Sequence, residues 1–246
     1  MMVAEVLNGH DAGLLIICDH ASSHVPYDID LGVTLNPDDL YQMHIAVDTG
    51  ALDVAKWLAE AFDSPAVLAT VSRLVIDLHR EPDHPKLIPT ESDGWDIPGN
   101  IGADRGDRIA RFYDPYHEAI ARQVAAYRPE LIVSIHSFTP RLATSDVARP
   151  WTVGILYNQD ERAARIAIEW LRGQGLEVGD NEPYSGKLLN ATLNRHAEAH
   201  GIPYIAVEIR ADGIADPDGV RLWSGRMQQM IAHVRNSLAS NGSPAT

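Results

Sequence analysis

Three apolar runs in this sequence end abruptly in side chains of the kind that bind metals or transfer protons. The runs, with the polar residues that follow them, are 14–18 with Asp19 and His20, 131–133 with Ser134 and His136, and 204–207 with Glu208. Short apolar runs bounded in this way are typical of strands buried in a parallel sheet. Ligands bind beyond the carboxyl ends of such strands, so we expect these polar side chains to meet at one edge of the sheet.

The other elements expected from the sequence alternate between helix and strand. Asn36-Pro37-Asp38-Asp39 predicts the start of a helix, and Gly50 interrupts it or joins it to a second helical stretch that ends at Phe62. The remaining expected strands are 66–69, 74–78 and 152–156, and the remaining helices are 104–127 with a break near Asp114-Pro115, 160–171, 188–200 and 218–238. This order predicts a three-layer α/β/α fold with a mainly parallel, mixed sheet.

Length and composition predict one domain over residues 1–246, with a disordered tail at 239–246. The proline-rich and glycine-rich segment 81–100 is expected to be a long loop close to the site. The net charge of −14, with only 20 lysines and arginines spread along the chain, argues against nucleic acid as a partner. Cys18 is the only cysteine, which excludes an intrachain disulfide and a cysteine-based zinc site. No apolar stretch is long enough to cross a membrane, so we expect a cytoplasmic protein.

The histidines and carboxylates at the expected rim form a ligand set suited to Zn²⁺, and another divalent metal remains an alternative. A catalytic zinc keeps three protein ligands and one open position. His20 and His136 are the first two candidates. Asp48 is the preferred third ligand, because its carboxylate would neutralise part of the metal charge; His24 and His44 compete with it.

Glu208 and a cluster of arginines supply the other candidate residues. An unpaired carboxylate at the end of an apolar strand is costly to bury, so Glu208 either pairs with an arginine or acts as a base beside the metal. Arg73 and Arg80 flank Asp77 in the segment Arg73-Leu74-Val75-Ile76-Asp77-Leu78-His79-Arg80. Either these three form a structural ion-pair cluster, or a guanidinium binds a substrate carboxylate or stabilises a developing oxyanion. In the second case, Asp77 would orient a ligand histidine.

Together, several short segments resemble the N-formylglutamate amidohydrolase family. They occur in the family's order between about residues 14 and 212: 19–22, 44–50, 73–80, Ser134-Ile135-His136-Ser137-Phe138, Asn181-Glu182-Pro183-Tyr184-Ser185-Gly186 and 207–212. The resemblance implies a zinc carboxypeptidase-like, phosphorylase/hydrolase-like fold. It also implies hydrolysis of a small acidic N-acyl amino acid, with N-formylglutamate giving formate and glutamate.

The resemblance also implies roles for individual residues. His136 matches the later zinc histidine, His20 takes the place of the first, and Glu208 matches the general base. Of the two arginines, Arg73 is the one expected to take part in catalysis. Arg80 and His79 match a substrate-binding segment. The segment that contains Asn181, Tyr184 and Ser185 either lines the pocket or is a surface turn built on Pro183 and Gly186.

The sequence departs from the family pattern at three places. Ser23 stands where the carboxypeptidases have a glutamate ligand, His79 replaces an asparagine, and Asp19-His20-Ala21 replaces Pro-His-Ser. Two other functions therefore stay open. One is a deacylase or carboxypeptidase acting on another N-acyl group, and the other is a non-catalytic module that binds a metal or ligand. The sequence gives no oligomeric state.

Overall fold

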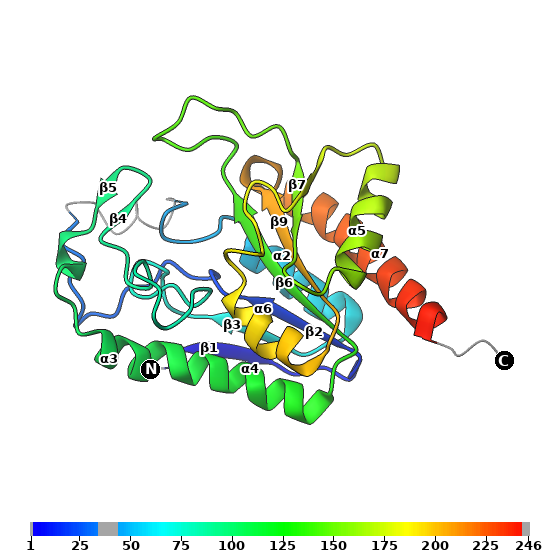
Figure 1. Ribbon diagram of the computed structural model, residues 1–246, viewed down its shortest axis with the longest axis horizontal. Coiled ribbons are helices and arrows are strands. Elements are labelled where there is room, and N and C mark those ends of the chain that lie inside the picture. The colour runs from blue at the N-terminus through cyan, green and yellow to red at the C-terminus, as the bar shows by residue number, and fades with distance from the viewer. Residues whose placement is uncertain (1, 34–43, 243–246) are drawn as a thin grey trace.

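The computed structural model describes residues 2–33 and 44–242, and it has the expected three layers (Figure 1). Its seven-stranded sheet has the order β1-β3-β2-β6-β9-β7-β8. These strands are β1 (Ala4–Leu7), β2 (Leu14–Cys18), β3 (Ala66–Ala69), β6 (Leu131–Phe138), β7 (Val153–Leu156), β8 (Val178–Asp180) and β9 (Tyr204–Arg210). The central strands β3, β2, β6 and β9 are parallel, whereas β1 and the β7–β8 pair run antiparallel to their neighbours. The predicted fold class is confirmed.

Helices cover both faces of the sheet. Helices α2, α5 and α7 pack on one face, and α4 and α6 lie on the other (Figure 1). The helices are α2 (Ala51–Phe62), α3 (Arg105–Arg108), α4 (Asp114–Tyr127), α5 (Arg162–Gly173), α6 (Ala191–His196) and α7 (Pro217–Gly242). Short 3₁₀ turns occupy Pro98–Asn100, Glu198–His200 and Ala211–Gly213, and a small hairpin joins β4 (Glu91–Ser92) to β5 (Trp95–Asp96).

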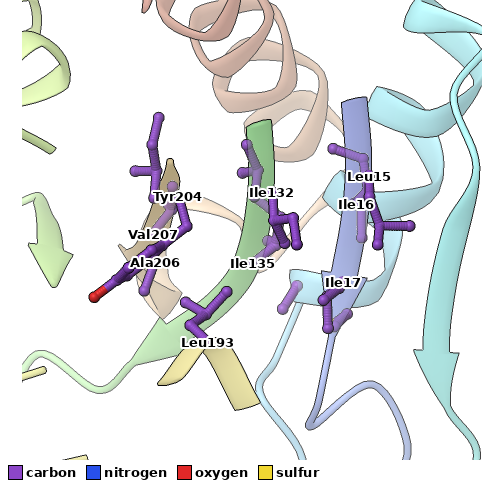
Figure 2. Close-up of a cluster of buried hydrophobic side chains, with 14 of the residues drawn as sticks. Leu15, Ile16, Ile17, Ile132, Ile135, Leu193, Tyr204, Ala206 and Val207 are labelled. Carbon is purple, nitrogen blue, oxygen red and sulfur yellow. The ribbon is translucent and has the colours of Figure 1, made fainter. Parts of the chain in front are cut away.

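The hydrophobic core lies between the central strands and the helices on each face. Figure 2 shows Leu15, Ile132 and Val207 among the side chains that the three central strands contribute to it. The apolar residues of β2 are completely buried. Continuous apolar runs are needed because helices cover both faces of these strands, so neither set of alternating side chains reaches water. The polar residues that follow the runs lie where this cover ends.

Several expected elements differ in extent from the observed ones. The helix predicted to begin at Asn36 lies outside the described residues. No break is found near Pro115: residues 105–127 are helical throughout and include a π-helical turn, Ile109–Tyr113, in which the Asp114 N–H donates to Ile109 O. Helix α7 continues to Gly242, beyond the predicted end at 238, so the predicted disordered tail is helical over 239–242; residues 243–246 lie outside the described part. The segment 81–100 carries the β4–β5 hairpin and lines the site, as its composition suggested.

Residues 74–78 are not a strand, contrary to the prediction. They form a turn, in which Val75 N–H donates to Ser72 O and Arg80 N–H donates to Asp77 O. The charged side chains explain the difference. Arg73 and Arg80 both donate to Asp77 Oδ2, at 3.1 and 3.0 Å. In a strand, side chains at odd and even positions point to opposite faces, so the two arginines could not both reach one carboxylate.

Candidate active site

The ends of three central strands bring the predicted site residues together. His136 in β6 lies directly opposite Glu208 in β9, and His20 follows β2 by two residues. Asp48 joins them because its backbone N–H donates to His20 O, at 3.0 Å, while its own carbonyl accepts from Ala51 N–H at the start of α2. The sheet therefore positions two histidines and a glutamate, and the backbone hydrogen bond from Asp48 to His20 brings the aspartate beside them.

His20, Asp48 and His136 form a compact buried group, which we call the ligand cluster. Asp48 Oδ2 lies 3.3 Å from His20 Nδ1 and 2.9 Å from His136 Nδ1. All three side chains are buried, and their ligand atoms lie close enough to share one metal ion. His24 and His44 are not part of this group. His24 is exposed on a different part of the surface, and His44 Nε2 bonds to Asp93 Oδ2 at 2.7 Å.

A second carboxylate holds the far nitrogen of each histidine in the ligand cluster. Asp77 Oδ1 lies 2.7 Å from His20 Nε2, the position predicted for a residue that orients a ligand. Asp19 Oδ2 lies 3.2 Å from His136 Nε2. Histidine ligands in metal sites usually donate their other N–H to a carboxylate in this way. The arrangement leaves each Nδ1 pointing at Asp48.

The chemistry of these donors fits a divalent cation. A neutral imidazole carries one proton, so it can donate to a carboxylate from only one of its two nitrogens. Without a cation, both histidines must be doubly protonated to satisfy a carboxylate at each nitrogen. Accordingly, Asp48 and Asp77 raise the pKa of His20 even though burial and Arg73 lower it. A cation between the two Nδ1 atoms and Asp48 Oδ2 would remove this requirement.

Asp19, His79 and His136 form a second group with metal-ligand spacing. It shares His136 with the ligand cluster but uses Nε2, which lies 3.2 Å from Asp19 Oδ2. Asp19 already accepts hydrogen bonds from Tyr116, Ser134 and Thr192, which occupy both of its oxygens. The ligand cluster is therefore the better cation site, because its shared oxygen faces only nitrogen donors: the two imidazoles and, at 3.3 Å, the Ser137 N–H.

Glu208 is buried beside the ligand cluster, and its Oε2 has no hydrogen-bond partner among the described residues. Burial raises its pKa to about 7; the positive charge of His136 opposes this effect and the negative charge of Asp48 adds to it. Of the two alternatives that the sequence left open for Glu208, a pair with an arginine is not found among the described residues. A carboxylate that is desolvated but faces a cavity has the properties of a proton acceptor near neutral pH.

Arg73 and Arg80 reach the same cavity from the turn at 73–80. Arg73 donates from one terminal nitrogen to Asp48 Oδ1 and from the other to Asp77 Oδ2, both at 3.1 Å. Arg80 uses its Nε for Asp77, its Nη1 contacts His84, and its side chain lines the cavity. Each arginine thus forms ion pairs with buried aspartates and still has N–H donors that could bind a ligand.

The cavity next to these residues has a volume of about 330 Å³. His20, His136 and Glu208 line its inner end, and His79, Arg80 and Tyr184 line its sides. Its outer wall includes Lys86, which has no ionic partner among the described residues, and the β4–β5 hairpin. This volume is at the small end of the usual range for ligand pockets.

Asn181 and Ser185 are not among the residues that line the cavity, and their predicted contact with substrate stays a prediction. Asn181 Oδ1 accepts from the backbone N–H groups of Tyr157 and Gly186, both at 3.0 Å. The carbonyl of Ser185 accepts from Leu188 and Leu189. These residues build the turn that carries Tyr184 into the cavity wall, which is the alternative the sequence left open.

The sequence reasoning did not assign a role to Asp19. It is 1% exposed and contacts both His136 and His79, with His79 Nδ1 3.1 Å from its Oδ2. Its position directly after the β2 run was a usable signal, because that run delivers Asp19 and His20 to the same rim. Thr192 and Tyr116, which complete its surroundings, come from helices and gave no such signal.

A model of the N-formylglutamate amidohydrolase family matches residues 12–215. The chain belongs to this family. It is therefore an amidohydrolase, as predicted, and the matched range contains every residue of the site described above. No curated protein sequence matches the chain.

Two solved structures are similar to the chain over almost its whole length. The crystal structure of the gene product Atu2144 from Agrobacterium tumefaciens is similar, with 32% sequence identity, a TM-score of 0.88 and 97% of each chain covered. The N-formylglutamate amidohydrolase from Ralstonia eutropha JMP134 has the same fold, with 18% identity, a TM-score of 0.67 and coverage of 97% of this chain and 98% of that one. No helix in the described ranges is both long and apolar enough to cross a bilayer.

Proposed function

We propose that this amidohydrolase uses a divalent metal, most simply Zn²⁺, to hydrolyse the amide bond of a small acidic N-acyl amino acid. The preferred substrate is N-formyl-L-glutamate, which would give formate and glutamate. The observation that carries the proposal is the placement of Glu208, a buried carboxylate with an unpartnered oxygen, directly beside His136 of the ligand cluster. Family membership supports the reaction class, and the donor chemistry of the cluster supports the metal.

His20, Asp48 and His136 would hold the metal. Bound there, it would polarise the amide carbonyl and make a water molecule more acidic. The surrounding charges favour a cation: four acidic groups face two guanidinium groups, namely Asp19, Asp48, Asp77 and Glu208 against Arg73 and Arg80. Asp77 and Asp19 would keep both imidazole rings in the orientation that exposes Nδ1.

Glu208 would act as the general base and then as the acid. It takes a proton from the attacking water and returns it to the departing nitrogen, so that the amine leaves in neutral form. A pKa near 7 suits both steps, because the group accepts and releases a proton at similar cost. Arg73, whose guanidinium lies between Asp48 and Asp77, would stabilise the negative charge that develops on the carbonyl oxygen.

The cavity wall suits an acidic substrate despite the net charge of −14. Arg80 presents its terminal nitrogens, and Lys86 supplies a second positive charge near the cavity entrance. Charges farther away than about 8–10 Å are screened by salt, so these local cations decide binding. A substrate with two carboxylates, such as an N-acyl glutamate, could use both.

Metal analysis combined with a formate-release assay tests the proposal. The purified protein should contain about one divalent metal per chain, and it should release formate from N-formyl-L-glutamate. A chelator should abolish this activity, and added Zn²⁺ should restore it. N-formyl-L-leucine tests the need for the second carboxylate, and N-acetyl-L-glutamate tests the acyl group. Stoichiometric metal without turnover of any substrate would contradict the proposal and favour a binding module.

A further inference from the structure

The carboxylate of Asp19 is in contact with five polar side chains. Its Oδ1 accepts from Tyr116 Oη at 2.9 Å and from Thr192 Oγ1 at 2.8 Å. Its Oδ2 lies 3.2 Å from Ser134 Oγ, 3.1 Å from His79 Nδ1 and 3.2 Å from His136 Nε2. Each of these five groups can donate a hydrogen bond to Asp19, and together they contact both of its oxygens. A carboxylate surrounded by donors in this way acts as an anion, which can only accept hydrogen bonds.

An anionic Asp19 determines which nitrogen carries the proton in two histidines at once. With a cation in the ligand cluster, the single proton of His136 lies on Nε2, which is 3.2 Å from Asp19 Oδ2 and 2.9 Å from Ser134 Oγ, and the Nδ1 lone pair faces the cation. His79 must place its proton on Nδ1. Its Nε2 has no hydrogen-bond partner among the described residues, and its ring lines the cavity. With its proton on Nδ1, the neutral ring presents Nε2 to the cavity as a hydrogen-bond acceptor.

We propose that Asp19 is a positioning residue that fixes both tautomers: Nδ1 of His136 is directed to the metal, and Nε2 of His79 to the substrate. The catalytic consequence of this inference rests on the proposed function. The tautomers themselves follow from the contacts of Asp19. His79 then accepts a hydrogen bond, and therefore selects a substrate group that carries a proton, such as an amide N–H.

Imidazole ¹⁵N NMR of the wild-type protein tests the tautomers directly, with signals assigned through His79→Gln and His136→Gln variants. In the metal-free protein, His79 should be neutral with its proton on Nδ1. On addition of Zn²⁺, the signal of His136 Nδ1 should shift as a metal-bound nitrogen, while Nε2 keeps its proton. A proton on His79 Nε2 would overturn the proposal. So would Zn²⁺ bound through His136 Nε2 and His79 Nδ1, the outcome expected if Asp19, His79 and His136 formed the metal site.

The Asp19→Asn variant tests the consequence. The amide keeps the shape of the side chain but presents N–H groups on one side, so it cannot accept from both histidines. We expect Zn²⁺ affinity to fall about 10–100-fold, the usual cost of losing a carboxylate behind a histidine ligand. We also expect kcat to fall and the ¹⁵N signal of His79 to report a changed tautomer. Asp28→Asn is the matched control, because Asp28 pairs with Arg111 at the surface, away from this site.

The two proposals fail in different ways. A wild-type protein that binds no metal and hydrolyses no N-acyl amino acid would contradict the proposed function, and the tautomer of His79 would still be readable. An active, metal-loaded Asp19→Asn protein with wild-type Zn²⁺ affinity and unchanged ¹⁵N signals would contradict the role of Asp19 alone. If Asp19→Asn does not fold, the NMR measurement on the wild-type protein decides the question.

Discussion

The inner end of the cavity and its outer wall are built in different ways. The inner end consists of buried side chains at strand ends, and the ligand cluster is fixed by the sheet and by the carboxylates behind it. The outer wall consists of loops, which meet at Asp93: its carboxylate accepts from His44, from the backbone of Ala143 and from both backbone and side chain of Thr144. Rigid strand ends suit the reaction itself, which depends on exact geometry, whereas loops suit the selection of a substrate.

This comparison predicts that changes at the inner end abolish chemistry and that changes in the wall alter binding or stability. The largest effect is expected for Glu208→Gln. The amide has nearly the same shape, so the fold and the bound metal should be retained. Turnover should fall by about 10²–10⁴, because neither the attacking water nor the leaving nitrogen has a proton-transfer partner. Measured kcat and metal content decide this; wild-type turnover in a metal-loaded variant would refute the role of Glu208.

The next largest effect should come from Asp48→Asn. The substitution removes the negative charge of the shared oxygen between His20 and His136, so we expect Zn²⁺ affinity to fall at least about tenfold. His24→Ala is the matched control, since His24 is exposed and lies away from the cavity. Titration with a competing chelator measures both affinities. If His24→Ala empties the site and Asp48→Asn does not, the ligand cluster is wrongly defined.

A smaller effect is expected at the side of the cavity. Arg80→Lys keeps the positive charge but loses the planar pair of donors that can hold a carboxylate at two points. KM for N-formyl-L-glutamate should rise about tenfold, equivalent to ~1.4 kcal/mol, with little change in kcat. KM for a neutral N-formyl amino acid is the internal control and should change less. Equal changes for both substrates would show that Arg80 acts through Asp77.

The smallest effect should be on stability, at Asp93. Hydrogen bonds from Ala143 and Thr144 outweigh burial and lower the pKa of Asp93 to about 2. Because the folded-state pKa lies below the unfolded value near 4, the stabilisation is complete above pH 4 and is lost as the pH falls from 4 to 2. Asp93→Asn should lower Tm at pH 7 by about 2–4 °C, the shift expected for ~1 kcal/mol.

The same variant should have a much smaller effect on Tm near pH 2, where about half of the wild-type carboxylate is itself protonated. Asparagine tolerates the positive φ of 43° at this position, so the change removes the charge and one acceptor oxygen without straining the backbone. Thermal unfolding at both pH values, measured on wild type and variant, gives the comparison. A Tm difference that is the same at pH 2 and pH 7 would contradict the assigned role of the Asp93 charge.

The sequence alone determined the central strands and the residues that they deliver. Apolar runs that end in His20, His136 and Glu208 could be recognised because a parallel strand covered on both faces must be apolar until it reaches the rim. Asp48 was harder to place. Its position depends on a backbone hydrogen bond to His20, a contact across 28 residues that no local pattern encodes.

Only the tertiary structure decided which partners the charged side chains contact. The segment 73–80 reads as an apolar strand, yet it folds as a turn because two arginines converge on Asp77. Asn181 and Tyr184 lie three residues apart, but one holds the turn together and the other lines the cavity. Asp19 and His79, two departures from the family pattern, proved to be in contact. Sequence periodicity reports burial, whereas the partner of a buried charge depends on which distant segments the fold brings within hydrogen-bonding distance.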